Sequence, residues 1–206
     1  PLVLFPMELS EEDRSYYRRY QFQALTEEEA NDLLNLQGIE GVRGFTAVFM
    51  LTETMKKAIG SISEAIKGVQ LLVDSEINPE KKGKWKLLKK RLEVERCFYR
   101  NVIHAAQFQD LVDRTDFENP PVRMLRWPTR NDSRIEEFQN ITRSEIDNSY
   151  ELADLLKEDL EEVLLCTSPD KEDIFMYSTD FVKQMVHKAE IMLDHMNDGS
   201  RVYETH

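Results

Sequence analysis

The sequence predicts an all-α protein, an elongated bundle of four long helices with two shorter helices at its N-terminal end. The 206 residues include only seven glycines and seven prolines, too few for the closely spaced turns of an all-β fold. Hydrophobic residues make up 41% of the chain, enough for a core, and they recur at helical spacing. We expect a single domain over residues 1–206, with short helices and a connection over 1–43. The bundle is expected over 44–198, with an irregular loop at 115–132.

The two N-terminal helices are predicted from their capping residues. Ser10 is followed by three acidic residues, which predicts a capped helix running to about Ala24. Thr26–Glu29 has the form of a capping box, in which the threonine and the glutamate satisfy each other's backbone amides. A second short helix therefore runs to about Gln37, and Gly38 provides a left-handed end.

The first long helix has the strongest periodic signal in the chain. Apolar residues follow a 3-4 spacing over four heptads, which is typical of a helix that packs lengthwise against its neighbours. The nine positions are Phe45, Val48, Thr52, Met55, Ile59, Ile62, Ile66, Val69 and Val73, of which eight are apolar. If part of this stripe faces outward, we expect the chain to form a homo-oligomer.

A central helix is predicted next. Asn78 serves as its cap and Pro79 as its first residue, and a broad apolar stripe carries the helix to about Arg114. A stripe that broad indicates neighbours on more than one side. The prolines between residues 119 and 128 then prevent regular helix, so we expect the loop at 115–132.

Two further long helices complete the predicted bundle. Apolar residues at helical spacing predict one over residues 133–166. The last is predicted to begin at Ser168 and Pro169, a serine cap followed by proline at the first position, and to end at Asp198 and Gly199.

The charge of the chain limits its partners. Its formal charge is −12, which opposes binding to a nucleic-acid backbone. No apolar stretch approaches the ~20 residues of a membrane span, so none is expected. The chain begins with Pro1, and we expect it to be part of a longer protein. The compartment stays open: the cytoplasm, or outside the cell if the chain belongs to a secreted enzyme.

The sequence contains no recognisable catalytic constellation. A di-iron bundle needs Glu-x-x-His on two helices, but His187 and Glu190 stand in the reverse order. His104 has no carboxylate one turn away, and Cys97 and Cys166 stand alone on separate helices. We therefore assign no catalytic residue, and we predict no metal site and no cofactor. The sequence favours a chain that is not an enzyme by itself, and it leaves that question open.

Two basic segments are candidate binding sites. The first is a docking patch for an acidic partner, with seven basic residues in eleven: Lys81, Lys82, Lys84, Lys86, Lys89, Lys90 and Arg91. The second is a loop in which arginines surround a tryptophan: Arg123, Arg126, Trp127, Arg130 and Arg134. Arginine offers forked donors to carboxylates, and tryptophan offers a flat face to a sugar or a side chain. Both segments are also compatible with solvated or packing roles.

Two stretches, Trp85 to Asn101 and Glu145 to Ala153, resemble the helical region that follows the catalytic barrel in some large bacterial glycoside hydrolases. The resemblance covers about residues 50–165 and includes no motif from which a catalytic residue can be transferred. It implies an accessory domain of a secreted carbohydrate-active enzyme, with sugar contact near Trp127.

The favoured hypothesis is a non-catalytic helical scaffold or binding module whose partner is another protein or the rest of its own longer chain. The alternatives are the carbohydrate-enzyme accessory domain and, less favoured, a helical-bundle metalloenzyme.

Overall fold

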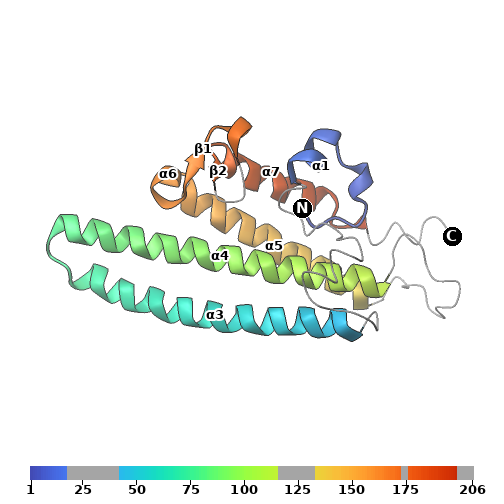
Figure 1. The fold of residues 1–206 in the computed structure, drawn as a ribbon, viewed down its shortest axis with the longest axis horizontal. Helices are drawn as coiled ribbons and strands as arrows, with labels where there is room; N and C mark the ends of the chain where they lie inside the picture. The colour runs from blue at the N-terminus through green and yellow to red at the C-terminus, as the bar shows by residue number, and fades with distance from the viewer. Residues whose placement is uncertain (18–41, 116–132, 173–175, 199–206) are drawn as a thin grey trace, which may run out of the picture.

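The computed structural model describes residues 1–17, 42–115, 133–172 and 176–198 of the chain (Figure 1). Over these residues the protein is mostly helical and contains only two strands, each of two residues, which confirms the all-α class. The long helices are α3 (Val42–Ser75), α4 (Pro79–Thr115), α5 (Ser133–Leu156) and α7 (Phe181–Asp194). The short ones are η1 (Pro6–Glu8), α1 (Glu11–Tyr17) and α6 (Leu160–Val163).

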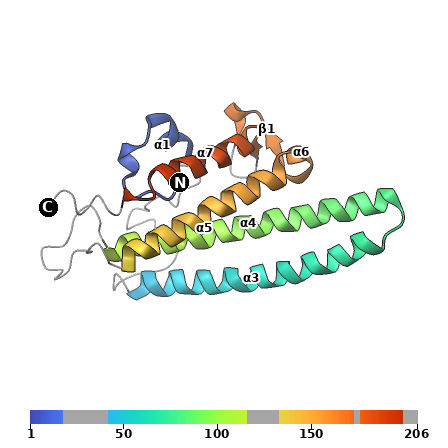
Figure 2. The ribbon, with the colours of Figure 1, turned by 180° about the vertical axis from the view of Figure 1, so that it is seen from behind.

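The helices pack in the order in which they follow one another along the chain. α3 packs against α4, α4 against α5, and α5 against α7. Figures 1 and 2 show α3, α4 and α5 side by side, with α7 and α1 on the side of α5 that faces away from α3. α4 is therefore a central helix, as its broad stripe predicts. No described helix is long and apolar enough to cross a membrane.

Two of the predicted helix starts are stabilised by their caps. The Ser10 hydroxyl accepts a hydrogen bond of 3.0 Å from the Asp13 amide at the start of α1. The Asn78 side chain accepts from the amides of Glu80 and Lys81 at the start of α4, at 3.0 and 3.2 Å. These bonds satisfy amides that the first helical turn leaves unpaired. The predicted helix over 26–37 and the predicted loop after residue 115 lie outside the described residues.

The 3-4 stripe of α3 faces the protein. The eight stripe positions from Val48 to Val73 are all buried or half-buried, whereas Phe49 and Met50, next to the stripe, are more than half exposed. The stripe thus covers α4, as a lengthwise packing surface should.

The predicted helix over 133–166 is too long. α5 ends at Leu156, and the chain turns through residues 157–159 before α6 begins at Leu160. Leu160 and Val163 pack against the same hydrophobic cluster as Leu156. Apolar residues at these positions fit a continued helix and a helix that folds back equally well, so the spacing does not distinguish the two.

The start of the last helix is also predicted wrongly. Ser168 and Pro169 begin only a single 3-10 turn, η2 (Pro169–Lys171), and α7 begins at Phe181. The strands β1 (Cys166–Thr167) and β2 (Tyr177–Ser178) pair in parallel on either side of η2. Tyr177 stacks on Phe98 of α4, with ring centroids 5.6 Å apart. This packing competes with helix formation, and a cap signal alone does not reveal it.

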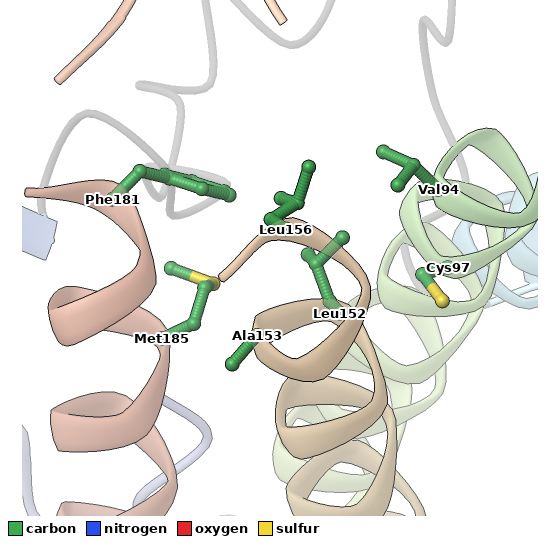
Figure 3. Close-up of a cluster of buried hydrophobic side chains, with 7 residues drawn as sticks. All are labelled: Val94, Cys97, Leu152, Ala153, Leu156, Phe181 and Met185. Atoms are coloured by element: carbon green, nitrogen blue, oxygen red, sulfur yellow. The ribbon is translucent and has the colours of Figure 1, made fainter. Parts of the chain in front are cut away.

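The core joins α4, α5 and α7. Its largest cluster comprises Val94, Cys97, Leu152, Ala153, Leu156, Phe181 and Met185. Figure 3 shows Phe181 and Met185 extending from α7 towards α5, and Val94 and Cys97 facing it from α4. Val94 packs at the level of Leu156, the last residue of α5, so α5 covers α4 only up to this point.

Candidate functional site

The hairpin formed by α3 and α4 continues past the end of α5. From Pro79 to Val94, fifteen positions farther along, α4 rises about 22 Å at 1.5 Å per residue. In Figures 1 and 2 the turn between α3 and α4 extends beyond α6, away from the rest of the molecule. We call residues 61–91, which form this projecting end of the hairpin, the arm.

The arm buries one apolar face and exposes other apolar side chains. Ile66, Val69 and Val73 of α3 are buried between the two helices of the arm. Ile77, in the turn, is 93% exposed, and Leu71 is 70% exposed. Leu72 and Leu88 are exposed as well. A helical pair buries less of its surface than a bundle does, so these aliphatic side chains stay exposed.

The predicted basic patch lies on the arm. Residues 61–91 contain eight basic and four acidic side chains, a formal charge of +4 on a chain whose total is −12. The rest of the chain therefore carries −16. The structure thus brings the seven basic residues onto the first turns of α4, beside exposed aliphatic side chains.

The patch residues nearest the base of the arm have partners within the protein. Lys90 forms an ion pair with Asp159, and the Arg91 guanidinium donates to the Glu162 backbone carbonyl at 2.6 Å. These contacts hold the segment 157–163 against α4.

Farther out on the arm the charges are available. Lys84 pairs with Glu80 at 2.7 Å, but both side chains are more than 70% exposed, so the pair contributes little. Lys81, Lys82 and Lys86 form no ion pair with a described residue. The outer half of the patch is therefore free to meet a partner.

The second predicted site is described only in part. Arg123, Arg126, Trp127 and Arg130 lie outside the described residues. Arg134 lies in the first turn of α5 and is half-buried. The arginine and tryptophan loop stays a prediction.

A buried group of polar side chains that is not predicted from the sequence joins α4, α5 and α7. We call it the polar cluster; its members are Asn101, His104, Glu145, Asn148, Ser149 and Lys188. The Glu145 carboxylate lies at its centre and is fully buried. It accepts hydrogen bonds from the Asn101 amide at 2.6 Å and from the Lys188 ammonium, and lies 2.6 Å from His104 Nδ1.

Helical spacing places these residues together. Glu145 and Asn148 continue the inward stripe of α5 between Ile141 and Leu152, and Lys188 lies one turn after Met185 on the inward face of α7. The available signal is the presence of polar residues in otherwise apolar stripes: Glu145 and Asn148 on α5, and Lys188 on α7. His104 has no carboxylate one turn away on its own helix, because its partner Glu145 belongs to α5.

The electrostatics of Glu145 indicate a structural role for the polar cluster. Burial by itself raises the pKa of this carboxyl, but the positive charge of Lys188 and the hydrogen bond from His104 outweigh it, and the pKa is lowered to about 2. The carboxylate is therefore charged at neutral pH and enclosed by protein. A general acid or base needs a pKa near the working pH and access to substrate, so the polar cluster is suited to joining helices.

Comparison with known proteins gives no match. No family model, curated protein or solved structure matches this chain. Its function is therefore inferred from its own surfaces.

Among the described residues, one group has the composition and spacing of a metal site. Glu8, His195 and Asp198 each offer one ligand atom, and these atoms all lie within 4.8 Å of one another. Glu8 is separated from the other two by almost the whole chain, so no local motif predicts the group.

Proposed function

We propose that this chain is a non-catalytic helical binding module, and that the arm binds an acidic helical segment of a partner protein. One observation carries the proposal: the arm, which extends past the end of α5, combines positive charge with exposed aliphatic side chains. A second function for the Arg123 to Arg134 loop is not proposed, because its tryptophan lies outside the described residues.

The shape of α4 favours a helix as the binding partner. α5 packs against α4 through Val94 and Cys97. Counting back along α4 at the same 3-4 spacing, this face continues to Lys90, which pairs with Asp159, and beyond it to Leu87 and Gly83. A Cβ atom added at Gly83 would meet nothing within 4 Å, so the surface there is open. A partner helix would therefore extend along α4 the packing that α5 begins.

The charge distribution favours an acidic partner. Lys84 and Lys86 stand beside this face in the helical register, and Lys81 and Lys82 lie one turn nearer the tip. Carboxylates on both sides of an aliphatic stripe would meet them directly. Because the rest of the chain is strongly acidic, the same partner is repelled elsewhere, and attraction over about 10 Å orients it towards the arm.

The test uses a short amphipathic helix of leucine and glutamate as the probe and tryptophan emission as the readout. The chain has two tryptophans, so Trp127→Phe leaves Trp85, half-buried on the arm, as the reporter. We expect saturable binding of the acidic peptide that weakens as salt is added. The same peptide with glutamine in place of glutamate should bind about tenfold more weakly, equivalent to ~1.4 kcal/mol.

Two charge-reversal variants identify the surface. In the first, Lys81, Lys82, Lys84 and Lys86 are replaced by glutamate. In the second, which is the matched control, Lys56, Lys57, Lys157 and Lys183 are replaced by glutamate; these lysines are exposed and lie outside the arm. Both variants change the net charge equally. We expect only the first to lose binding. Equal binding of the acidic and neutral peptides, or equal losses in the two variants, would contradict the proposal.

A further inference from the structure

The two ends of the described chain meet beside α7. η1 ends at Glu8, and α7 is followed by His195 and, three residues later, Asp198. Figures 1 and 2 show α1 beside α7, away from the tip of the arm. His195 Nδ1 lies 2.7 Å from an Asp198 carboxylate oxygen, and the Glu8 carboxylate completes the group within 4.8 Å.

We propose that Glu8, His195 and Asp198 form a binding site for a divalent transition-metal ion, and that zinc fits it best. One imidazole nitrogen and two carboxylate oxygens are ligands that zinc takes at about 2.0–2.2 Å. An imidazole ligand disfavours calcium and magnesium, which prefer oxygen ligands alone. Three protein ligands leave a fourth tetrahedral position for water or for a ligand from outside.

The local geometry preorganises two of the three ligands. The Asp198 amide donates to the His195 carbonyl at 3.1 Å, and this turn places both side chains on the same side. Asp198 is 5% exposed, so its carboxylate is held in place by its surroundings. Tetrahedral bonds of about 2.1 Å separate ligand atoms by roughly 3.4 Å, so the histidine and the aspartate need to part by less than about 1 Å. Glu8 is exposed and adjusts by rotating its side chain.

A second histidine shows what distinguishes this group. His187 Nε2 lies 2.8 Å from an Asp13 oxygen, and its Nδ1 lies 3.8 Å from a Glu190 oxygen. Asp13 and Glu190 thus approach opposite nitrogens of one ring and cannot converge on a single ion. His187 therefore provides a matched control: a histidine beside two carboxylates that does not form a metal site.

Metal at this site would fasten the N-terminal segment to α7. The contacts there include a small apolar cluster of Val3, Leu9, Tyr17 and Ile191, and a hydrogen bond of 2.8 Å from the Tyr17 hydroxyl to the Gln184 carbonyl. His187 of α7 also pairs with Asp13 of α1. A ligand that binds only the folded state raises its stability in proportion to the logarithm of ligand concentration. Zinc should therefore raise the thermal midpoint.

The experiment titrates chelator-treated protein with zinc chloride and, separately, with magnesium chloride. Equilibrium dialysis measures the bound metal, and circular dichroism measures the midpoint of thermal unfolding. We expect one zinc per chain, a higher midpoint, and no comparable effect of magnesium. His195→Gln should lose zinc binding and His187→Gln should keep it. Glu8→Gln changes an exposed side chain, so it should fold normally and bind zinc at least about tenfold more weakly.

Several results would overturn the proposal. They are an absence of bound zinc, equal binding of magnesium, or zinc binding that survives both Glu8→Gln and His195→Gln. Equal losses in His195→Gln and His187→Gln would show that zinc binds to surface histidines in general. Cobalt gives an independent readout, because a tetrahedral site with nitrogen and oxygen ligands produces a visible absorption spectrum that His195→Gln should abolish.

Discussion

Replacing Glu145 by glutamine removes the charge at the centre of the polar cluster and keeps the size of the side chain. Lys188, whose side chain is 10% exposed, then loses the carboxylate to which it donates. Breaking a buried ion pair by removing one partner costs about 3–5 kcal/mol, because the remaining charge stays buried. The glutamine oxygen still accepts from Asn101, so we expect a loss at the lower end, about 3 kcal/mol.

The lowered pKa of Glu145 also favours a stabilising charge. Its fall from the usual value of 4.5 to about 2 corresponds to about 3 kcal/mol in favour of the charged form, at 1.36 kcal/mol per unit. Because the pKa is lower in the folded protein, this stabilisation is complete above pH 4.5 and is lost as the pH falls from 4.5 towards 2. Glu145→Gln should lack this contribution to the acid dependence.

The assay is urea unfolding followed by far-ultraviolet circular dichroism at pH 7, repeated at lower pH. Glu151→Gln is the matched control: Glu151 is on the same helix and pairs with Arg96 and Arg100 at 3.0 and 2.5 Å, but its side chain is 38% exposed. A partly exposed pair of this kind contributes about 0.2–1 kcal/mol. The reasoning is wrong if Glu145→Gln costs no more than Glu151→Gln.

A double-mutant cycle isolates the pair itself. Glu145→Met and Lys188→Met each leave one buried charge, whereas the double variant leaves none, so it should be more stable than either single variant. Stability losses that simply add would refute the claim that Glu145 and Lys188 stabilise each other.

Two further predictions concern α4 and its neighbours. Cys97 is fully buried, and burial raises its pKa to about 12, whereas Cys166 is half-buried. A thiol reagent should therefore label Cys166 first, and Cys97 only when the protein opens. Fast labelling that persists in Cys166→Ser would contradict this. Asn78→Ala removes an acceptor for two helix-start amides and should lower the free energy of unfolding by about 1 kcal/mol, whereas Asn78→Asp should preserve it. An unchanged urea midpoint in Asn78→Ala would count against the cap.

The elements that the sequence predicts well are those whose signals are local and agree with one another. α3 has an uninterrupted apolar stripe, and α4 has a cap, a proline at its first position and a broad stripe, so both were predicted to within a few residues. The segment 157–180 has local signals that conflict with its packing. Leu160 and Val163 keep the helical spacing although the chain has turned back. Ser168 precedes only a single 3-10 turn, and its side chain forms no capping hydrogen bond there.

The candidate sites divide in the same way. The basic patch is contiguous in the sequence, so its residues were predicted by number, and the structure adds that they lie on a projecting arm. The polar cluster and the group of Glu8, His195 and Asp198 come from segments far apart in the chain. A stripe indicates that Glu145 faces inward, but it cannot indicate which residue of another helix Glu145 will meet.

The polar cluster and the arm are connected through the register of the helices. An interface made only of leucine and valine loses little when one helix slides along another, since each side chain finds a similar neighbour. Glu145 prevents such a slide: one turn, about 5.4 Å, would take it away from Asn101 and His104 on α4 and from Lys188 on α7. Asn148 adds to this by donating to the Cys97 carbonyl at 3.0 Å. The register in turn places Leu156, where α5 ends, beside Val94. The buried charge therefore fixes how much of α4 is left uncovered, and so fixes the length of the surface that the arm presents to a partner.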